Sequence, residues 1–232
     1  IKRVPLTQYK AQSRGGKGSL SATLIEGDYI NQIFTATTKS FITFFTNAGK
    51  VYWIKVHEIP EASRSSRGSS VKSLIQLSPD EEISTIVTMK DYTDQQYIFM
   101  STANGTVKKC KTTEFANAKT RGVIGIKLHD GDHLVSAMLT SGNDDAMLIT
   151  RKGQALRVSE ESVRPMGRAS SGVTGIRLAS GDEVAAAISV EQNKDALVIT
   201  EKGYGKRVGF DEFGKHGRGT GGQKIFGNIE GK

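Results

Sequence analysis

The sequence predicts an all-β, propeller-like array of four-stranded blades, each roughly 50 residues long. Tetrads that end in glycine recur at intervals of 56, 48 and 50 residues. Each tetrad lies between two short runs rich in apolar and β-forming residues, which is the pattern of a β-hairpin. Between the hairpins, alternating polar and apolar stretches indicate further strands, and no stretch is a convincing helix.

The hairpins are the most regular elements of the repeat. Their turns are predicted at 46–49, 102–105, 150–153 and 200–203, after apolar runs at 41–45, 97–100, 146–149 and 196–199. The second runs end at Ile54, Cys110, Val158 and Val208. The opening residues Ile1–Val4 are similar to the second half of one more hairpin. We therefore expect one domain over residues 1–232, with about 4.6 periods, that lacks its first strand and most of its last blade.

A polar, basic connection that contains glycine follows each hairpin. These connections lie at 64–68, 119–122, 167–172 and 216–222. An alternating strand comes next, as at 123–128 or 173–178, and leads through an acidic turn to a last apolar strand. Each unit thus carries about four short strands, the number expected of a propeller blade.

One position within the repeat is basic in four of five units. The residue before the last apolar position of the hairpin is Arg3, Lys109, Arg157 or Arg207, and it is Trp53 in the remaining unit. Side chains alternate between the two faces of a strand, so the cation is expected to point away from its apolar neighbour. These cations therefore predict a basic stripe on the outward face.

The charge distribution indicates a polyanionic partner. The net charge is +8; residues 1–72 hold 11 Lys or Arg against 4 Asp or Glu, whereas residues 73–232 hold 21 against 20. The basic excess surrounds a glycine-rich loop, Gln12–Gly18, that carries Arg14 and Lys17. Glycine lets a backbone approach a ligand closely, and Arg and Lys bind phosphate. Nucleic acid is the predicted partner.

Other motifs do not support catalysis or a bound cofactor. The loop at 15–19 departs from the phosphate-loop pattern, and the glycines 217, 219 and 222 lie in a blade connection rather than between a strand and a helix. His129 and His133 flank an acidic turn that other units form without histidine. We therefore predict no catalytic site, no cofactor and no metal. No apolar run approaches the ~18 residues of a membrane helix.

The stretch Gln12–Gly18 resembles the seven-residue box in the C-terminal domain of DNA gyrase A. Further stretches resemble the same domain, namely 49–53, 65–68, 105–109, 163–168, 203–207 and 216–220. The box differs in one position, since Ser13 stands where the family has arginine. The paralogous domain of topoisomerase IV shares the repeat but has a degenerate box or none, so gyrase is preferred. That paralogue and a protein-interaction propeller with a basic rim are the alternatives.

The resemblance implies a six-bladed β-pinwheel that binds duplex DNA without sequence specificity and wraps it around a basic rim. In the family this wrap serves negative supercoiling by DNA gyrase, an ATP-dependent type II topoisomerase of the bacterial cytoplasm that acts at the nucleoid. The implied partners are double-stranded DNA, the remainder of gyrase A, and gyrase B, in an A2B2 holoenzyme. The cleaving tyrosine and the ATPase lie elsewhere in that enzyme, and the isolated domain is expected to be monomeric.

The predicted DNA-binding residues belong to three groups. The box supplies Gln12, Arg14, Gly15, Gly16, Lys17 and Gly18. The hairpin position and the residue beside it supply Arg3, Lys108, Lys109, Arg157, Lys206 and Arg207. The basic connections supply Arg64, Arg67, Lys119, Arg121, Arg168 and Arg218.

Overall fold

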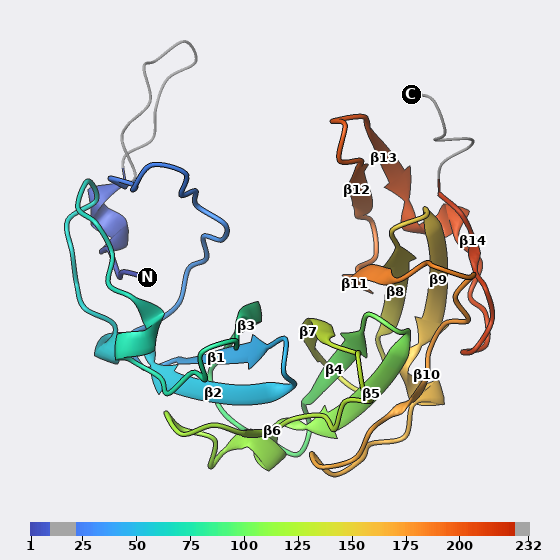
Figure 1. The fold of residues 1–232 in the computed structure, drawn as a ribbon, viewed down its shortest axis with the longest axis horizontal. Helices are drawn as coiled ribbons and strands as arrows, with labels where there is room; N and C mark the ends of the chain where they lie inside the picture. The colour runs from blue at the N-terminus through green and yellow to red at the C-terminus, as the bar shows by residue number, and fades with distance from the viewer. Residues whose placement is uncertain (10–21, 226–232) are drawn as a thin grey trace.

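The structure is a computed structural model that describes residues 1–9 and 22–225. Its sheets follow one another around an open arc (Figure 1). Four hairpins form the middle of the blades: β1 (Phe41–Thr46) with β2 (Lys50–Lys55), β4 (Tyr97–Thr102) with β5 (Thr106–Lys111), β8 (Asp145–Thr150) with β9 (Gln154–Ser159), and β12 (Asp195–Ile199) with β13 (Gly205–Gly209). The predicted all-β propeller architecture and the predicted hairpins are confirmed.

Each four-stranded sheet has a strand on either side of its hairpin. The strands toward the inside of the arc are β3 (Ile83–Met89), β7 (Leu134–Thr140) and β11 (Val184–Val190). Those on the outside are β6 (Val123–Ile124), β10 (Val173–Thr174) and β14 (Gln223–Lys224). The strand orders are β3-β1-β2-β6, β7-β4-β5-β10 and β11-β8-β9-β14, all antiparallel, and β12 pairs with β13 alone. Each outer strand comes from the connection after the next hairpin, so neighbouring units share a sheet.

The helical elements in the described residues are short 3-10 segments. They are η1 (Leu6–Gln8), η2 (Val56–Glu58), η3 (Val71–Ser73), η4 (Thr112–Phe115), η5 (Glu160–Ser162) and η6 (Phe210–Glu212). η2, η4, η5 and η6 each follow the second strand of a hairpin directly. The last three begin the connections that lead to the outer strands β6, β10 and β14.

The turn glycines explain why the outer strands are shorter than the sequence predicts. Gly49 has φ 72°, and a Cβ there would lie 2.7 Å from the carbonyl oxygen of Ile126. The Gly49 carbonyl in turn accepts hydrogen bonds from Gly125 N and Ile126 N. The chain therefore leaves the sheet after Ile124 and crosses the hairpin turn, so the expected strand over 123–128 is β6 alone. Gly105 organises the crossing after β10 in the same way.

The core lies between successive sheets. Phe45 and Val51 of the first sheet pack with Ile98, Met100 and Phe115, which belong to or follow the next hairpin. The clusters that follow along the arc are built similarly, with Phe99 and Val107 against Leu148 and then Met147 against Val208. Both faces of the first three hairpins are therefore largely buried, as in β1, where five of six residues are buried.

A side-chain donor from each of the first three hairpins, and Arg3 before them, binds at the 3-10 helix of the next unit. Trp53 Nε1 donates to the carbonyls of Phe115 and Ala116 at the end of η4, both at 3.2 Å. Lys109 Nζ donates to Glu160 O of η5 at 2.9 Å. The remaining members of this set are Arg3, whose Nε lies 3.3 Å from Ile59 O after η2, and Arg157, whose guanidinium lies 3.0 Å from Phe210 O of η6. We call these four contacts the inter-unit latch.

The latch satisfies buried carbonyl groups between units. An unpaired buried carbonyl costs free energy comparable to a lost hydrogen bond. Four residues of three chemical types supply the required N–H group at the same place. Trp53, the exception to the basic column in the sequence, therefore has the same structural role as its basic counterparts.

Glu81 anchors the first hairpin turn from a buried position. Its carboxylate accepts hydrogen bonds from Thr46 Oγ1 at 2.7 Å, from Tyr52 Oη at 2.9 Å and from Ser78 N at 3.1 Å. Burial raises the pKa of Glu81. These hydrogen bonds and the Lys50 ammonium, 3.5 Å away, together lower the pKa by more than burial raises it, so the net shift is downward. Burial and the Glu81 carboxylate raise the pKa of Tyr52.

The latch predicts a large effect of one buried lysine. Lys109→Met removes the cation 4.0 Å from the buried Glu160 carboxylate and should lower the free energy of unfolding by about 3 kcal/mol. The matched control is Lys111→Met on the same strand, where a partly exposed ion pair with Asp94 is lost at a cost below about 1 kcal/mol. Chemical denaturation at neutral pH measures both. Equal, small losses would contradict the latch.

Glu81 predicts an acid-sensitive component of stability. Because its folded pKa lies below the ordinary value of about 4.3, its contribution is complete above that value and is lost as the pH falls through the folded pKa. Glu81→Gln should reduce the free energy of unfolding at neutral pH by about 1–3 kcal/mol and weaken its decline in acid. Denaturation across this pH range, with exposed Glu82→Gln as control, measures the effect. A decline as steep as in the parent would contradict it.

Candidate nucleic-acid interface

The basic connections lie along the outside of the arc. The later three connections each run beside the second strand of the hairpin one unit earlier and end in the outer strands β6, β10 and β14 (Figure 1). Parallel bridges join Arg3 to Glu61, Lys109 to Pro165 and Arg157 to Lys215, and Trp53 N donates to Lys119 O at 3.1 Å. The backbone of the latch residues therefore holds the connections in place on the rim.

The predicted cations of the connections are available to solvent. Arg67, Lys119, Arg121, Arg168 and Arg218 are exposed, and Arg64 is partly exposed. They come from successive units, so cationic side chains recur along the outer edge. Lys206 and Arg207 of β13 are also exposed, and Arg207 forms an ion pair with Asp195 at 2.9 Å.

The prediction that the hairpin cations form an outward stripe is wrong at Lys109 and Arg157. Lys109 is 4% exposed and is engaged in the latch. Arg157 is half-buried and donates to Asp145 Oδ2 through Nε at 3.0 Å and a terminal nitrogen at 2.8 Å. Arg3 is partly buried beside Glu61, 2.9 Å away. Alternation along a strand separates two faces, but both faces of these hairpins are covered by neighbouring units.

Lys108, also predicted to contact DNA, is fully buried and has a different role. Its Nζ donates to the carbonyl oxygens of Gly125, Arg168 and Ser170 at 2.5–2.9 Å. Burial lowers the pKa of Lys108. Lys2, two repeats earlier, likewise donates to three carbonyl oxygens of a connection, at Ser63, Arg64 and Ser66. These two lysines fix the backbone on which the exposed arginines are mounted.

The box residues Gln12, Arg14, Gly15, Gly16, Lys17 and Gly18 lie outside the described residues. The residues that flank them are both tied to the first basic connection. Arg64 N donates to Gln8 Oε1 at 3.2 Å, and Thr23 Oγ1 donates to Ser65 O at 2.5 Å. The chain thus approaches and leaves the box region beside Arg64.

Two exposed cations outside the predicted set lie beside the connections. Lys127 N donates to Ser170 O at 3.0 Å, and Arg177 N donates to Thr220 O at 2.9 Å. Their equivalent positions after Gly125-Ile126 and Gly175-Ile176 are visible in the sequence. That repeat is the signal from which they could have been found.

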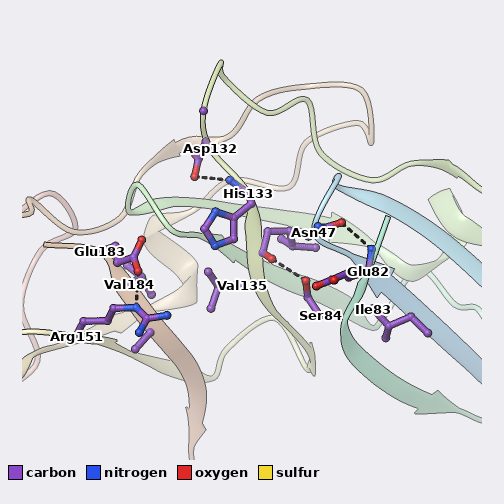
Figure 2. Close-up of a pocket in the computed structure, with 13 residues that line it drawn as sticks. Asn47, Glu82, Ile83, Ser84, Asp132, His133, Val135, Arg151, Glu183 and Val184 are labelled. Atoms are coloured by element: carbon purple, nitrogen blue, oxygen red, sulfur yellow. Dashed lines mark hydrogen bonds and ion pairs between the residues drawn. The ribbon is translucent and has the colours of Figure 1, made fainter. Parts of the chain in front are cut away.

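The inner side of the arc has a different chemical character. A pocket of 690 Å³ lies where three successive units meet, and Figure 2 shows Glu82, Asp132 and Glu183 around it. Its basic residue, Arg151, is paired with Glu183 and with Glu201. Asn47 and His133 also line it. A polyanion is disfavoured at this acidic wall, and the described residues contain no group of acidic, His or Cys side chains that could hold a metal.

The outer rim is suited to binding phosphates rather than reading bases. Its cations stand on backbone that is fixed by hydrogen bonds, and they recur once or more in each unit. Contacts of Lys and Arg with phosphate are independent of sequence, whereas base readout needs side chains that enter a groove. Within the described ranges, no helix is both long and apolar enough to span a membrane.

The chain matches the family model described as "DNA gyrase C-terminal domain, beta-propeller" in five consecutive segments, at residues 1–37, 40–88, 96–141, 144–191 and 194–232. It is 54% identical over 171 residues to DNA gyrase A of Treponema pallidum, a match that covers 74% of this chain and 21% of the relative. DNA gyrase A of Escherichia coli is 44% identical over 167 residues, covering 72% of this chain and 19% of the relative. The chain thus spans about a fifth of these relatives.

Solved structures are also similar along the whole chain. A DNA gyrase A C-terminal domain superposes with a TM-score of 0.81 at 33% identity, covering 100% of this chain and 75% of that one. The C-terminal domain of a DNA topoisomerase IV superposes with a TM-score of 0.82 at 27% identity, covering 100% and 71%. The repeat, the fold and the sequence matches agree: this chain belongs to the DNA gyrase C-terminal domain family.

Proposed function

We propose that this chain binds duplex DNA without sequence specificity along its outer rim and wraps it with a single handedness. The observation that carries the proposal is the recurrence of exposed cations in each basic connection on the outside of the arc. Each cation that meets a phosphate releases a counterion, which favours binding to any duplex. The acidic inner pocket leaves the rim as the favoured surface for a polyanion.

The cost of bending DNA explains why the cations are distributed over several units. Curving a duplex through a blade-sized arc costs on the order of a few kcal/mol. Several cation–phosphate contacts spread along the arc offset that cost and favour the curved path. The latch, and the hydrogen bonds from Lys2 and Lys108 to the backbone carbonyls of the connections, hold those cations at fixed positions. The rim therefore imposes its curvature on the DNA.

The box completes the wrap in this proposal. Gln8 and Thr23, which precede and follow it in the sequence, are tied to the first connection by hydrogen bonds to Arg64 and Ser65. Arg14 and Lys17 would fasten the DNA where the wrap is completed, and the later units would guide it there. Ser13 in place of the family's arginine removes about one phosphate contact and makes the salt dependence correspondingly shallower.

Within the whole enzyme the wrap would present a DNA segment for strand passage and so serve ATP-dependent negative supercoiling. The remainder of gyrase A, together with gyrase B, would supply DNA cleavage and ATP hydrolysis in an A2B2 assembly at the bacterial nucleoid. This chain acts there as the DNA-wrapping part, without a catalytic group of its own.

Ligation of nicked circular DNA in the presence of this chain tests the wrap. We expect a shift in linking number that diminishes as salt is raised, because the contacts are electrostatic. Duplex binding without a shift would contradict wrapping by this chain. Failure to bind duplex at low salt would overturn the proposal and favour a protein-interaction propeller.

The box predicts a separation of wrapping from binding. Arg14→Ala with Lys17→Ala should abolish the shift in linking number, while duplex affinity falls only about tenfold, because the rim contacts remain. Lys39→Ala with Lys90→Ala removes the same charge from exposed residues outside the connections and serves as control. Equal loss of wrapping and binding in the box variant would contradict this division of roles.

A further inference from the structure

Two segments from different units meet at the seam between the first two sheets and carry a cation each. Ser170 O accepts hydrogen bonds from Lys127 N at 3.0 Å and from Lys108 Nζ at 2.9 Å. Lys108 Nζ also binds Gly125 O and Arg168 O. One buried ammonium group therefore ties the crossing segment that carries Lys127 to the connection that carries Arg168.

The next seam repeats this arrangement with different contacts. Arg177 N donates to Thr220 O at 2.9 Å, and Gly219 N donates to Gly175 O at 2.6 Å. The Arg218 guanidinium donates to Ser162 O at 3.2 Å and Thr174 O at 3.4 Å, so its side chain lies across the seam. Leu156 takes the place of Lys108 here, and backbone and arginine contacts hold the two segments instead.

The added cations at both seams are free to bind an anion. Lys127 and Arg177 are exposed, and neither side chain forms a hydrogen bond or ion pair with another residue in ranges 1–9 and 22–225. Arg151 shows the contrast, since it is paired with Glu183 and Glu201. Arg218 retains guanidinium donors beyond those used in its carbonyl contacts, because the group has five N–H donors.

We propose that Lys127 and Arg177 bind DNA phosphates and complete two-unit anion sites, Lys127 with Arg168 and Arg177 with Arg218. This inference rests on the proposed DNA-binding function and adds residues to it. A phosphate at a seam would meet cations from two successive units, so the DNA would contact the domain where units join. The register of the units would then set the spacing of its phosphate contacts.

The preceding seam provides a natural comparison. Gln76 N donates to Thr120 O at 2.9 Å, which places Gln76 where Lys127 and Arg177 stand in later units. Its neighbours in the connection, Lys119 and Arg121, are exposed cations. This seam has the equivalent backbone hydrogen bond but lacks the added charge. Gln76→Lys should therefore create a third two-unit site.

The test measures the affinity of this chain for a linear DNA duplex of arbitrary sequence as a function of salt concentration. Lys127→Gln and Arg177→Gln should each weaken binding roughly threefold near physiological salt and reduce the salt slope by about one. Gln76→Lys should change both quantities by similar amounts in the opposite direction. Lys90→Gln is the control, since Lys90 is exposed beside the inner strand β3 and should have no effect.

A double-mutant cycle tests whether each site is shared between units. Lys127→Gln combined with Arg168→Gln should weaken binding less than the sum of the single changes, because both would lose the same phosphate. If the parent chain binds but Lys127→Gln and Arg177→Gln behave like Lys90→Gln, the seam sites are refuted while the proposed function stands. If the parent chain does not bind duplex, the proposed function itself fails. Thermal unfolding of each variant confirms that the exposed substitutions leave the fold intact.

Discussion

Each unit buries carbonyl groups of a short 3-10 helix against the unit before it, and a side-chain N–H group from that unit must satisfy them. Arg3, Trp53, Lys109 and Arg157 do so in turn. The residue type varies because the position needs only an N–H donor long enough to reach these carbonyls, and arginine, lysine and tryptophan side chains all provide one. The same strands bind the basic connections through their backbone, so one set of contacts both joins the units and places the rim.

The cations of this chain therefore divide into two classes with different physical roles. Lys108 and Lys109 are buried and bind backbone carbonyls, which makes them part of the framework. Arg168 and Lys127 are exposed and are mounted on the backbone that Lys108 fixes. Net charge counts both classes equally, but only exposed cations can neutralise a phosphate. A buried cation affects DNA binding through the position of its exposed neighbours.

Much of the fold followed from the spacing of glycine-ended turns and the β-rich runs around them. The hairpins appear where the sequence predicts them, because turn chemistry and strand propensity are local. The shortened strand after Ile124 could not be predicted, since it depends on the carbonyl of Gly49 in another unit. Family resemblance added the six-bladed pinwheel and the DNA-binding role of the box, which local rules alone do not supply.

The interface was predictable only in part. Basic loops are visible in the sequence, and those at Lys119, Arg121, Arg168 and Arg218 lie exposed on the rim. The outward direction of Lys109 was wrongly predicted, because alternation identifies a face but not what covers it. Lys127 and Arg177 occupy a repeated position after a Gly-Ile pair, but only the structure shows that this position lies beside a later connection.

The division of cations into framework and rim is tested most directly by lysine-specific chemical labelling with mass spectrometry, with and without duplex DNA. We expect that Lys119 and Lys127 are labelled in the free chain and protected by DNA, that Lys90 and Lys194, in the turns that follow the inner strands β3 and β11, are labelled in both states, and that Lys108 and Lys109 are unreactive throughout. Protection of Lys90 and Lys194 with continued labelling of Lys119 and Lys127 would contradict it.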